Sequence, residues 1–148
     1  MARGHGFSLT DLLIIVAVIL VIAAIAIPKL LRPQLAANEA AAANSLLVIN
    51  AAEIKYAAAN PTLGFVCTLP ALAGPRLIDA ALAGGSKAGY AFSIAGCSGK
   101  PATSYLATAR PTVPGETGTR VFCSDQTGII RFSPDSRLLC TSISRPVE

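Results

Sequence analysis

The sequence has few of the residues that most enzymes and metal proteins use. It contains no tryptophan, one methionine and one histidine, His5. Neither a Gly-x-Ser-x-Gly motif nor a phosphate-binding loop occurs, and no two carboxylates stand at an obvious catalytic spacing. Because histidine is the commonest general base, its absence from everything beyond residue 5 argues against acid–base chemistry. We expect the protein not to be an enzyme.

Charge and aromatic side chains are also scarce, which excludes two further classes. Charged residues make up 14% of the chain, and the net charge of +4 comes from basic residues that are scattered along it. Nucleic-acid binding needs a clustered basic surface, so we predict no nucleic-acid specificity. Five phenylalanines, three tyrosines and no Cys-x-x-Cys-His motif are too little for haem or an aromatic electron path. We therefore expect no cofactor.

What the chain does have is one long apolar run. Residues 12–27 are all Leu, Ile, Val or Ala, without a charged or hydrogen-bonding side chain. A helix that is apolar on every face belongs in lipid or in a dry assembly. From Phe7 to Ile27 such a helix is about 30 Å long, which is the thickness of a bilayer's hydrocarbon core. The segment can span a membrane.

Asp11 stands directly before this run. A carboxylate carried into a bilayer is costly, so it should have a partner or a role. One interpretation is an N-terminal helix cap at the headgroup level, where an acidic residue complements the helix dipole. The other is a role in assembly, which depends on its neighbours in the sequence.

Those neighbours resemble the N-terminus of type IV pilins and type II secretion pseudopilins. That family has a short basic leader ending in Gly, cleavage before Phe, an acidic residue four positions later, a long apolar helix and then Pro. The matching positions here are Gly6, Phe7, Asp11 and Pro28, around residues 12–27. The chain departs from the family at Asp11, where Glu is usual, by one methylene.

The resemblance implies a leader of residues 1–6, cut off by a prepilin peptidase that also methylates the amine of Phe7. Residues 7–28 would form a transmembrane and filament-core helix, with the N-terminus in the cytoplasm. Asp11 would pair with the Phe7 amine of a neighbouring copy. The precursor would lie in the bacterial inner membrane, contact the assembly platform there, and then join an extracellular or periplasmic helical homopolymer.

Two prolines follow the apolar run. Because each removes a backbone donor and clashes with the preceding turn, Pro28 and Pro33 predict a local helix break. Residues 29–60 then predict an amphipathic continuation, with apolar stripes through Leu47 and Ile54 and, adjacent to it, through Leu46 and Ile49. Asn60-Pro61 predicts its end.

The remaining residues, 61–148, predict a small globular head. Two short helical pieces are expected near residues 68–72 and 77–83. Three or four antiparallel strands should follow, drawn from five candidate segments near residues 90–94, 104–109, 120–124, 129–132 and 137–141. The expected fold is α+β, with a long N-terminal helix packed on a small antiparallel sheet. This order of elements is also that of pilins and pseudopilins, as the resemblance implies.

Four cysteines lie in the predicted head, with no Cys-x-x-Cys spacing and no histidine beside them: Cys67, Cys97, Cys123 and Cys140. This favours two disulfides over a zinc site, since small exported domains use disulfides to supplement their cores. Of the three possible connectivities we favour Cys67–Cys97 and Cys123–Cys140, because the second pair closes a short loop.

Some pseudopilins bind calcium near their C-terminal strands, and Asp125 and Asp135 offer oxygens there. The segment lacks a dense run of acidic ligands, so we predict no metal site.

The resemblance implies that the chain is a structural subunit of a type IV pilus-like filament. Two alternatives stay open: a pseudopilin of a type II secretion system, and an uncleaved membrane anchor that carries an extracytoplasmic binding module.

Overall fold

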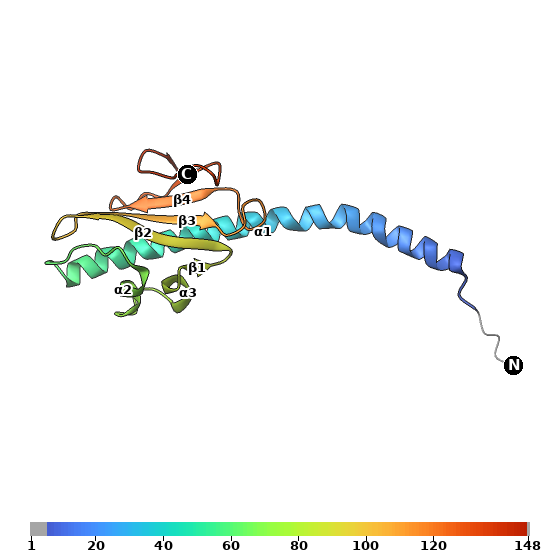
Figure 1. Cartoon of the computed structure of the whole chain (residues 1–148), viewed down its shortest axis with the longest axis horizontal. Helices are drawn as coiled ribbons and strands as arrows, with labels where there is room; N and C mark the ends of the chain where they lie inside the picture. The colour runs from blue at the N-terminus through green and yellow to red at the C-terminus, as the bar shows by residue number, and fades with distance from the viewer. Residues whose placement is uncertain (1–5, 148) are drawn as a thin grey trace. The chain divides into compact units, whose positions relative to one another are not determined.

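The computed structural model describes the backbone of residues 6–147 and, outside residues 27–31, their side chains. They form an α+β chain with an apolar N-terminal helix and a C-terminal antiparallel sheet (Figure 1). The chain forms two compact units, Met1–Gln34 and Leu35–Glu148, and helix α1 contributes to both. We call residues 35–147 the head. The elements are α1 (Leu9–Ala59), α2 (Leu69–Ala73), α3 (Ala80–Ala83), β1 (Ser86–Lys87), β2 (Tyr90–Ser98), β3 (Ser104–Pro111), β4 (Val121–Asp125), β5 (Arg131–Ser133) and β6 (Arg145–Pro146).

Helix α1 is assigned without interruption through both prolines. The sequence predicts a break at Pro28 and Pro33, whereas α1 includes both residues. A proline inside a helix costs about 3 kcal/mol. The runs of Leu and Ala on either side are strong helix formers, so the helical backbone continues through both positions. The boundary between the two compact units lies just after Pro33, between Gln34 and Leu35.

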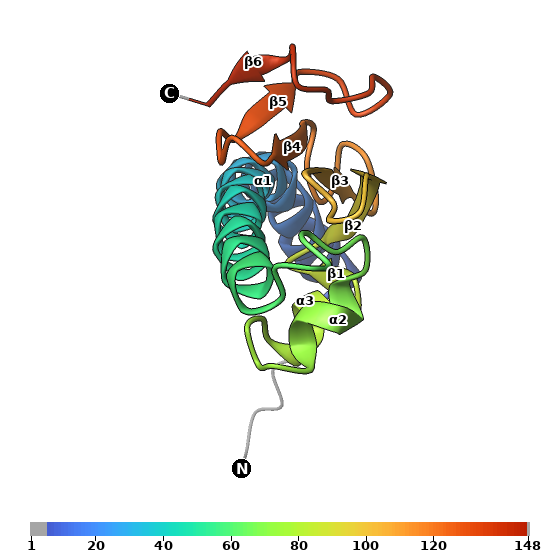
Figure 2. The ribbon, with the colours of Figure 1, turned by 90° about the vertical axis from the view of Figure 1, so that its left-hand side faces the viewer.

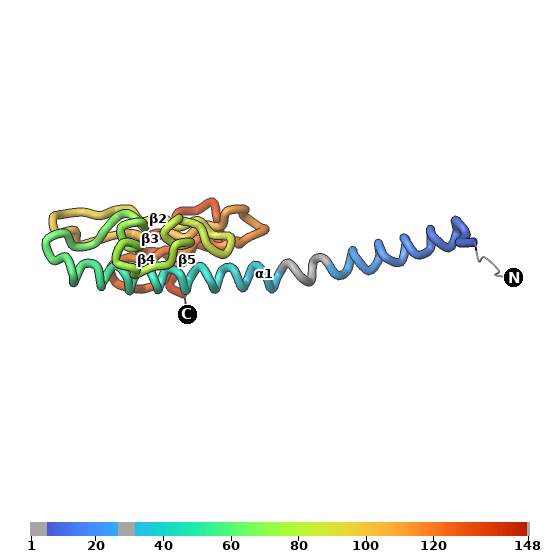
Figure 3. The backbone as a smooth tube through the Cα atoms, turned by 90° about the horizontal axis from the view of Figure 1, so that it is seen from below, coloured from blue at the N-terminus to red at the C-terminus, as the bar shows by residue number. Residues whose placement is uncertain are grey.

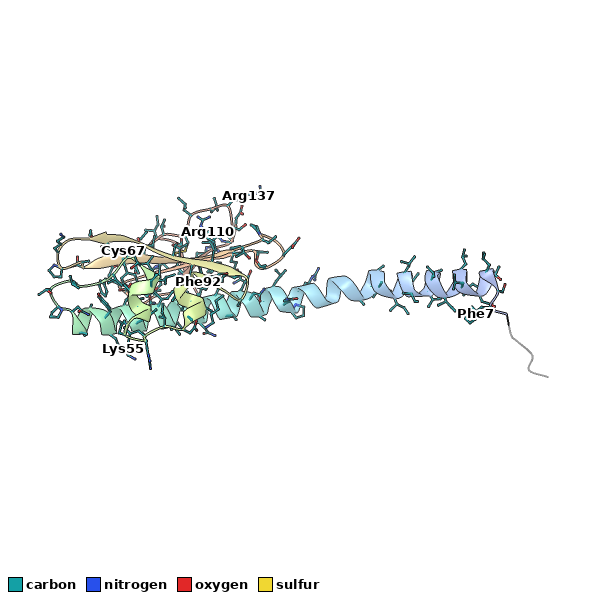
Figure 4. All side chains as sticks on the ribbon, turned by 60° about the horizontal axis from the view of Figure 1, so that its bottom comes forward. Phe7, Lys55, Cys67, Phe92, Arg110 and Arg137 are labelled. Atoms are coloured by element: carbon teal, nitrogen blue, oxygen red, sulfur yellow. A yellow bond between two sulfur atoms is a disulfide. The ribbon has the colours of Figure 1, made fainter. Side chains whose placement is uncertain are left out.

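Within the head, one face of α1 is buried. Leu46 and Ile49 are fully buried, whereas Leu47 and Ile54 of the other predicted stripe are 50% and 58% exposed. Lys55 points away from the sheet (Figure 4). The core therefore selects one of two neighbouring apolar stripes. The helix ends one residue before the Asn-Pro pair that predicts its end.

The sheet is a six-stranded antiparallel meander in the order β1-β2-β3-β4-β5-β6, as the edge-on view shows (Figure 2). Strands β2 to β5 lie at the first four predicted places. The prediction of a strand at residues 137–141 is wrong. There the Asp135 carboxylate accepts the Arg137 N–H and forms a turn instead. Two-residue strands β1 and β6 at the edges raise the total above the three or four expected.

The core lies between α1 and the inner face of the sheet, where β2 to β5 run over the C-terminal half of the helix (Figure 3). Alternate residues of β2 and β3 point inward, as a half-buried strand requires. Helices α2 and α3 add Leu69, Leu72 and Leu82 to this core. The larger buried members of the core are Leu46, Ile49, Leu69, Leu72, Ile78, Leu82, Tyr90, Phe92, Ile94, Tyr105, Phe122 and Ile130.

Both disulfides join the cysteines that the sequence favours. Cys67–Cys97 ties the segment after α1 to the end of β2, and Cys123–Cys140 ties β4 to the C-terminal loop. They span 30 and 17 residues. Closing loops of this size stabilises a fold by about 3–4 kcal/mol each in the chain-entropy model.

Two buried polar residues hold α1 to the sheet. Glu39 accepts hydrogen bonds from the N–H and Oγ1 of Thr119 at 2.9 and 2.8 Å, and its other oxygen lies 3.1 Å from the Nε of Arg120. Asn50 accepts the hydroxyl proton of Tyr105 at 2.9 Å. These contacts require one rotation of the helix, because a rotated helix leaves the groups buried and unpaired.

Glu53 is a third buried polar residue on the same face, but it is only partly satisfied. Its Oε2 accepts the Val66 N–H at 3.0 Å, while Oε1 has no hydrogen-bond partner among the described residues. Burial disfavours the charged carboxylate and raises the pKa of Glu53 to about 7, an effect that the Val66 hydrogen bond partly offsets.

We expect Glu53 to make the head more stable in acid. Because its pKa in the folded state lies above the unfolded value of 4.5, its contribution is full below that value and is lost as the pH rises through about 7. The difference amounts to about 3 kcal/mol. Denaturant unfolding of the detergent-solubilised full chain at acidic and mildly alkaline pH measures it. Glu53→Gln should remove this pH dependence, and Glu116→Gln, at an exposed carboxylate, should keep it. An equal free energy of unfolding at both pH values for the parent would contradict the assignment.

Candidate functional site

The predicted processing site lies just before α1. Gly6 and Phe7 precede the first helical residue, and the Phe7 side chain is 75% exposed. No heavy atom outside the adjacent residues lies within 4 Å of a Cβ placed on Gly6. The peptide bond between them is therefore accessible within residues 6–147. The rest of the predicted leader, residues 1–5, lies outside the described residues.

Asp11 lies in the first turn of α1 and contacts the residue that caps it. Ser8 accepts the first helical hydrogen bond through its carbonyl, from the Leu12 N–H at 3.1 Å, and donates its own N–H to Oδ2 of Asp11 at 3.4 Å. A carboxylate at the third helical position that accepts the N–H of a serine cap is one half of a capping box. The Ser-x-x-Asp spacing is its sequence signal. Within one copy, then, Asp11 has a local partner.

From Leu12 to Ala26 the surface of α1 is apolar. The window Leu9–Ala26 has a mean hydropathy of 3.0, and none of it is buried. By length and composition alone the window can cross a membrane. A signal sequence near an N-terminus meets the same two criteria. The side chains of the window stand out around the helix (Figure 4). None of the described residues of its own unit, Met1–Gln34, covers them.

The two carboxylates considered for calcium serve the backbone. Asp125 accepts hydrogen bonds from the N–H and hydroxyl of Thr127, and Asp135 accepts the Arg137 N–H. Among the described residues no group of three or more His, Cys, Asp or Glu side chains is placed to hold a metal ion. Each carboxylate acts as a turn cap.

The head contains a second candidate site, which the sequence does not predict. A cavity of about 520 Å³ is lined by Arg120, Phe132, Arg145, Pro146 and Val147. Arg145 of β6 is the cross-strand partner of Phe132 in β5, and the Arg120 guanidinium lies 5.3 Å from the centre of the Phe132 ring. No local motif marks this site, because its residues meet only through the pairing of β5 with a two-residue strand.

Comparison of the chain with protein-family models, with curated proteins and with solved structures finds no match.

The capping contact at Asp11 predicts a local effect on amide hydrogen exchange. Losing a helix cap costs about 0.5–2 kcal/mol, so Asp11→Ala should speed exchange in the first turn of α1 roughly two- to thirtyfold. Exchange of the full, unprocessed chain in detergent micelles measures this. Asp79→Ala removes the side-chain cap of α3 and is the matched control, which should leave α1 unchanged. Unaltered exchange at residues 8–12 in Asp11→Ala would show that the carboxylate does not cap the helix.

Proposed function

We propose that this chain is a structural subunit of a type IV pilus-like filament, cut after Gly6 and polymerised through its apolar N-terminal helix. The observation that carries the proposal is the exposed apolar window Leu9–Ala26, with one carboxylate in its first turn and an accessible Gly-Phe bond just before it. Because none of this apolar window is buried, it needs an apolar environment from outside its own unit.

Cleavage would create the charge that assembly uses. Hydrolysis of the Gly6–Phe7 bond releases residues 1–6 and leaves an amine at Phe7, which is protonated at neutral pH. Methylation of that amine by the same peptidase keeps the positive charge. Arg3 leaves with the leader, so the formal side-chain charge falls from +4 to 11 − 8 = +3.

Assembly would then exchange one apolar environment for another. Lipid tails and the dry centre of a filament are equivalent solvents for Leu and Ile, so moving the helix between them changes little exposed apolar area. Asp11 would determine how neighbouring copies align, because its carboxylate pairs with the Phe7 amine of a neighbouring copy. Such pairing offsets the cost of burying the charge and occurs at one axial stagger only.

The head supports this proposal at the level of architecture. A helix packed on an antiparallel sheet and two disulfides are compatible with a pilin-type fold in an oxidising compartment. The precursor would lie in the bacterial inner membrane, with its N-terminus cytoplasmic, next to the peptidase and the assembly platform. The filament would lie outside the cell or in the periplasm.

A pseudopilin of a type II secretion system is the nearest second candidate, because the same N-terminal residues serve it. Imaging of surface filaments and identification of this chain in them distinguishes the two. An uncleaved anchor with an extracytoplasmic binding module is the third candidate, and it requires Met1–Gly6 to remain on the mature chain.

Processing is the first test. Gly6→Val should leave an unprocessed precursor in the membrane, because the peptidase must fit the residue before the cut into a narrow site. Intact mass of the parent from cell envelopes should show the loss of residues 1–6 and a gain of about 14 Da from one methyl group. A Gly6→Val chain that still begins at Phe7, or a parent that keeps Met1, would overturn the processing step.

Substitutions at Asp11 test the pairing. Asp11→Asn keeps the shape of the side chain and removes its charge, so cleavage and insertion should persist while filament yield drops. Asp11→Glu should be tolerated, since it keeps the charge. Sheared filaments, quantified against total processed chain in an otherwise intact assembly system, give the readout. If Asp11→Asn polymerises as well as the parent, the carboxylate acts only as the cap of its own helix.

A further inference from the structure

The cavity beside β6 carries a positive charge that the described residues do not neutralise. Arg120 is paired with Glu39, at 3.1 Å between Nε and Oε2, and lies over the Phe132 ring. Arg145 takes part in no ion pair among residues 6–147. Among the described side chains, two guanidiniums and the carboxylate of Glu39 sum to a net charge of +1 here, on walls of Phe132 and Val147. It suits an occupant that carries one carboxylate and some apolar surface.

A second hollow widens this cavity toward the helix. It measures about 210 Å³ and shares Arg120 and Val147 with the first. Ala36, Ala40 and Ala43 of α1 form its other wall. We call the two hollows together the Arg145 groove. Because Arg120 is held from two sides, the groove exists before anything binds, which lowers the entropy cost of binding.

The head also presents one matching carboxylate. Its other described acids are engaged or buried: Glu39 pairs with Arg120, Asp79 with Lys87, Asp135 caps a turn, and Glu53 and Asp125 lie inside. Glu116 is exposed and takes part in no ion pair among residues 6–147.

Glu116 stands on a tip that is rigid. In the loop between β3 and β4, Thr117 N–H donates to the carbonyl of Val113 at 2.9 Å, and Val113 N–H donates to Thr117 Oγ1 at 3.1 Å. Gly115 N–H donates to the carbonyl of Gly118 at 2.8 Å. Val113 at the same tip is 44% exposed. The tip thus offers one exposed carboxylate and one exposed apolar side chain on an ordered backbone.

We propose that the Arg145 groove binds the Glu116 tip of a second copy of this chain. Glu116 meets the Arg145 guanidinium, and Val113 meets Phe132 and Val147. Tip and groove consist of different residues, so the contact is heterologous, and a heterologous contact that does not close generates an open helical polymer. The inference rests on the proposed function and names the contact between heads in that filament.

Charge exchange tests the contact in cells with an intact assembly system. Glu116→Arg and Arg145→Glu should each reduce filament yield at least severalfold, and the double variant should restore it, because it rebuilds the pair with reversed sign. Lys100→Glu, at an exposed cation outside the groove, is the matched control and should polymerise like the parent. If each single variant polymerises normally, or if the double variant is as poor as the singles, the contact is wrong.

A disulfide test separates this contact from the pilus proposal. With cysteines at both positions, Glu116→Cys/Arg145→Cys, mild oxidation of cell envelopes should give a ladder of multimers on a non-reducing gel. Either single cysteine should give dimers at most, and Glu116→Cys/Lys100→Cys should give no ladder. A ladder without surface filaments would support the contact and contradict the pilus function. Parent filaments without a ladder would leave the function standing and overturn the contact, and absence of both would overturn both.

Discussion

The exposed apolar surface of Leu9–Ala26 is the constraint on which the rest of the molecule depends. Twelve large apolar side chains in this window are 45% exposed or more. Burying a side chain of this kind is worth about 1.5–3 kcal/mol, so the window holds on the order of 20 kcal/mol of unrealised burial. That exceeds the roughly 5–15 kcal/mol by which a whole domain is normally stable. The environment that covers this segment therefore outweighs anything that the head contributes, and the head needs only to stay folded on its own.

The head achieves this by setting polar groups into the face of α1 that it buries. Because alanine side chains are small, packing alone does not determine the rotation of α1 about its axis. Either of two adjacent apolar stripes could face the sheet. Asn50 decides between them, because its amide donates to Ser124 Oγ at 2.7 Å while its oxygen accepts from Tyr105. Glu39, nearer the N-terminal end of the buried part of α1, adds a second contact that fixes the rotation, through Thr119 and Arg120. Rotating the helix to bury Leu47 would leave these groups without partners at about 1–3 kcal/mol each, which is more than an apolar exchange of stripes would gain.

The sequence predicts much of this, and its misses have identifiable causes. The α+β class, the apolar helix, both short helices and strands β2 to β5 follow from periodicity and turn residues, which are local signals. Strand β6 has two residues, one of them Pro146, and no strand propensity marks it; it exists because β5 and the loop closed by Cys140 hold it in place. The sequence does not predict the Arg145 groove for the same reason, since the groove depends on the pairing of β5 with β6. The buried Glu53 resembles an exposed helix residue until the chain after Ala59 folds back and Val66 supplies its donor.

Apolar packing and polar contacts have different tasks in the proposed filament. Burial of Leu and Ile is strong but non-directional, and a bundle of such helices gains almost as much at one stagger as at the next. Charged contacts are weak in water but exclude wrong registers, because a displaced copy leaves a carboxylate or an amine unpaired in a dry centre. The capping contact of Asp11 with Ser8 engages one carboxylate oxygen only, so it keeps the unassembled helix end ordered without consuming the group that pairing needs. An exposed contact such as Glu116 with Arg145 is worth less per pair. Both contacts would recur once per copy, so the register would be set at the helix by the stronger buried pair and supported at the heads by the weaker one.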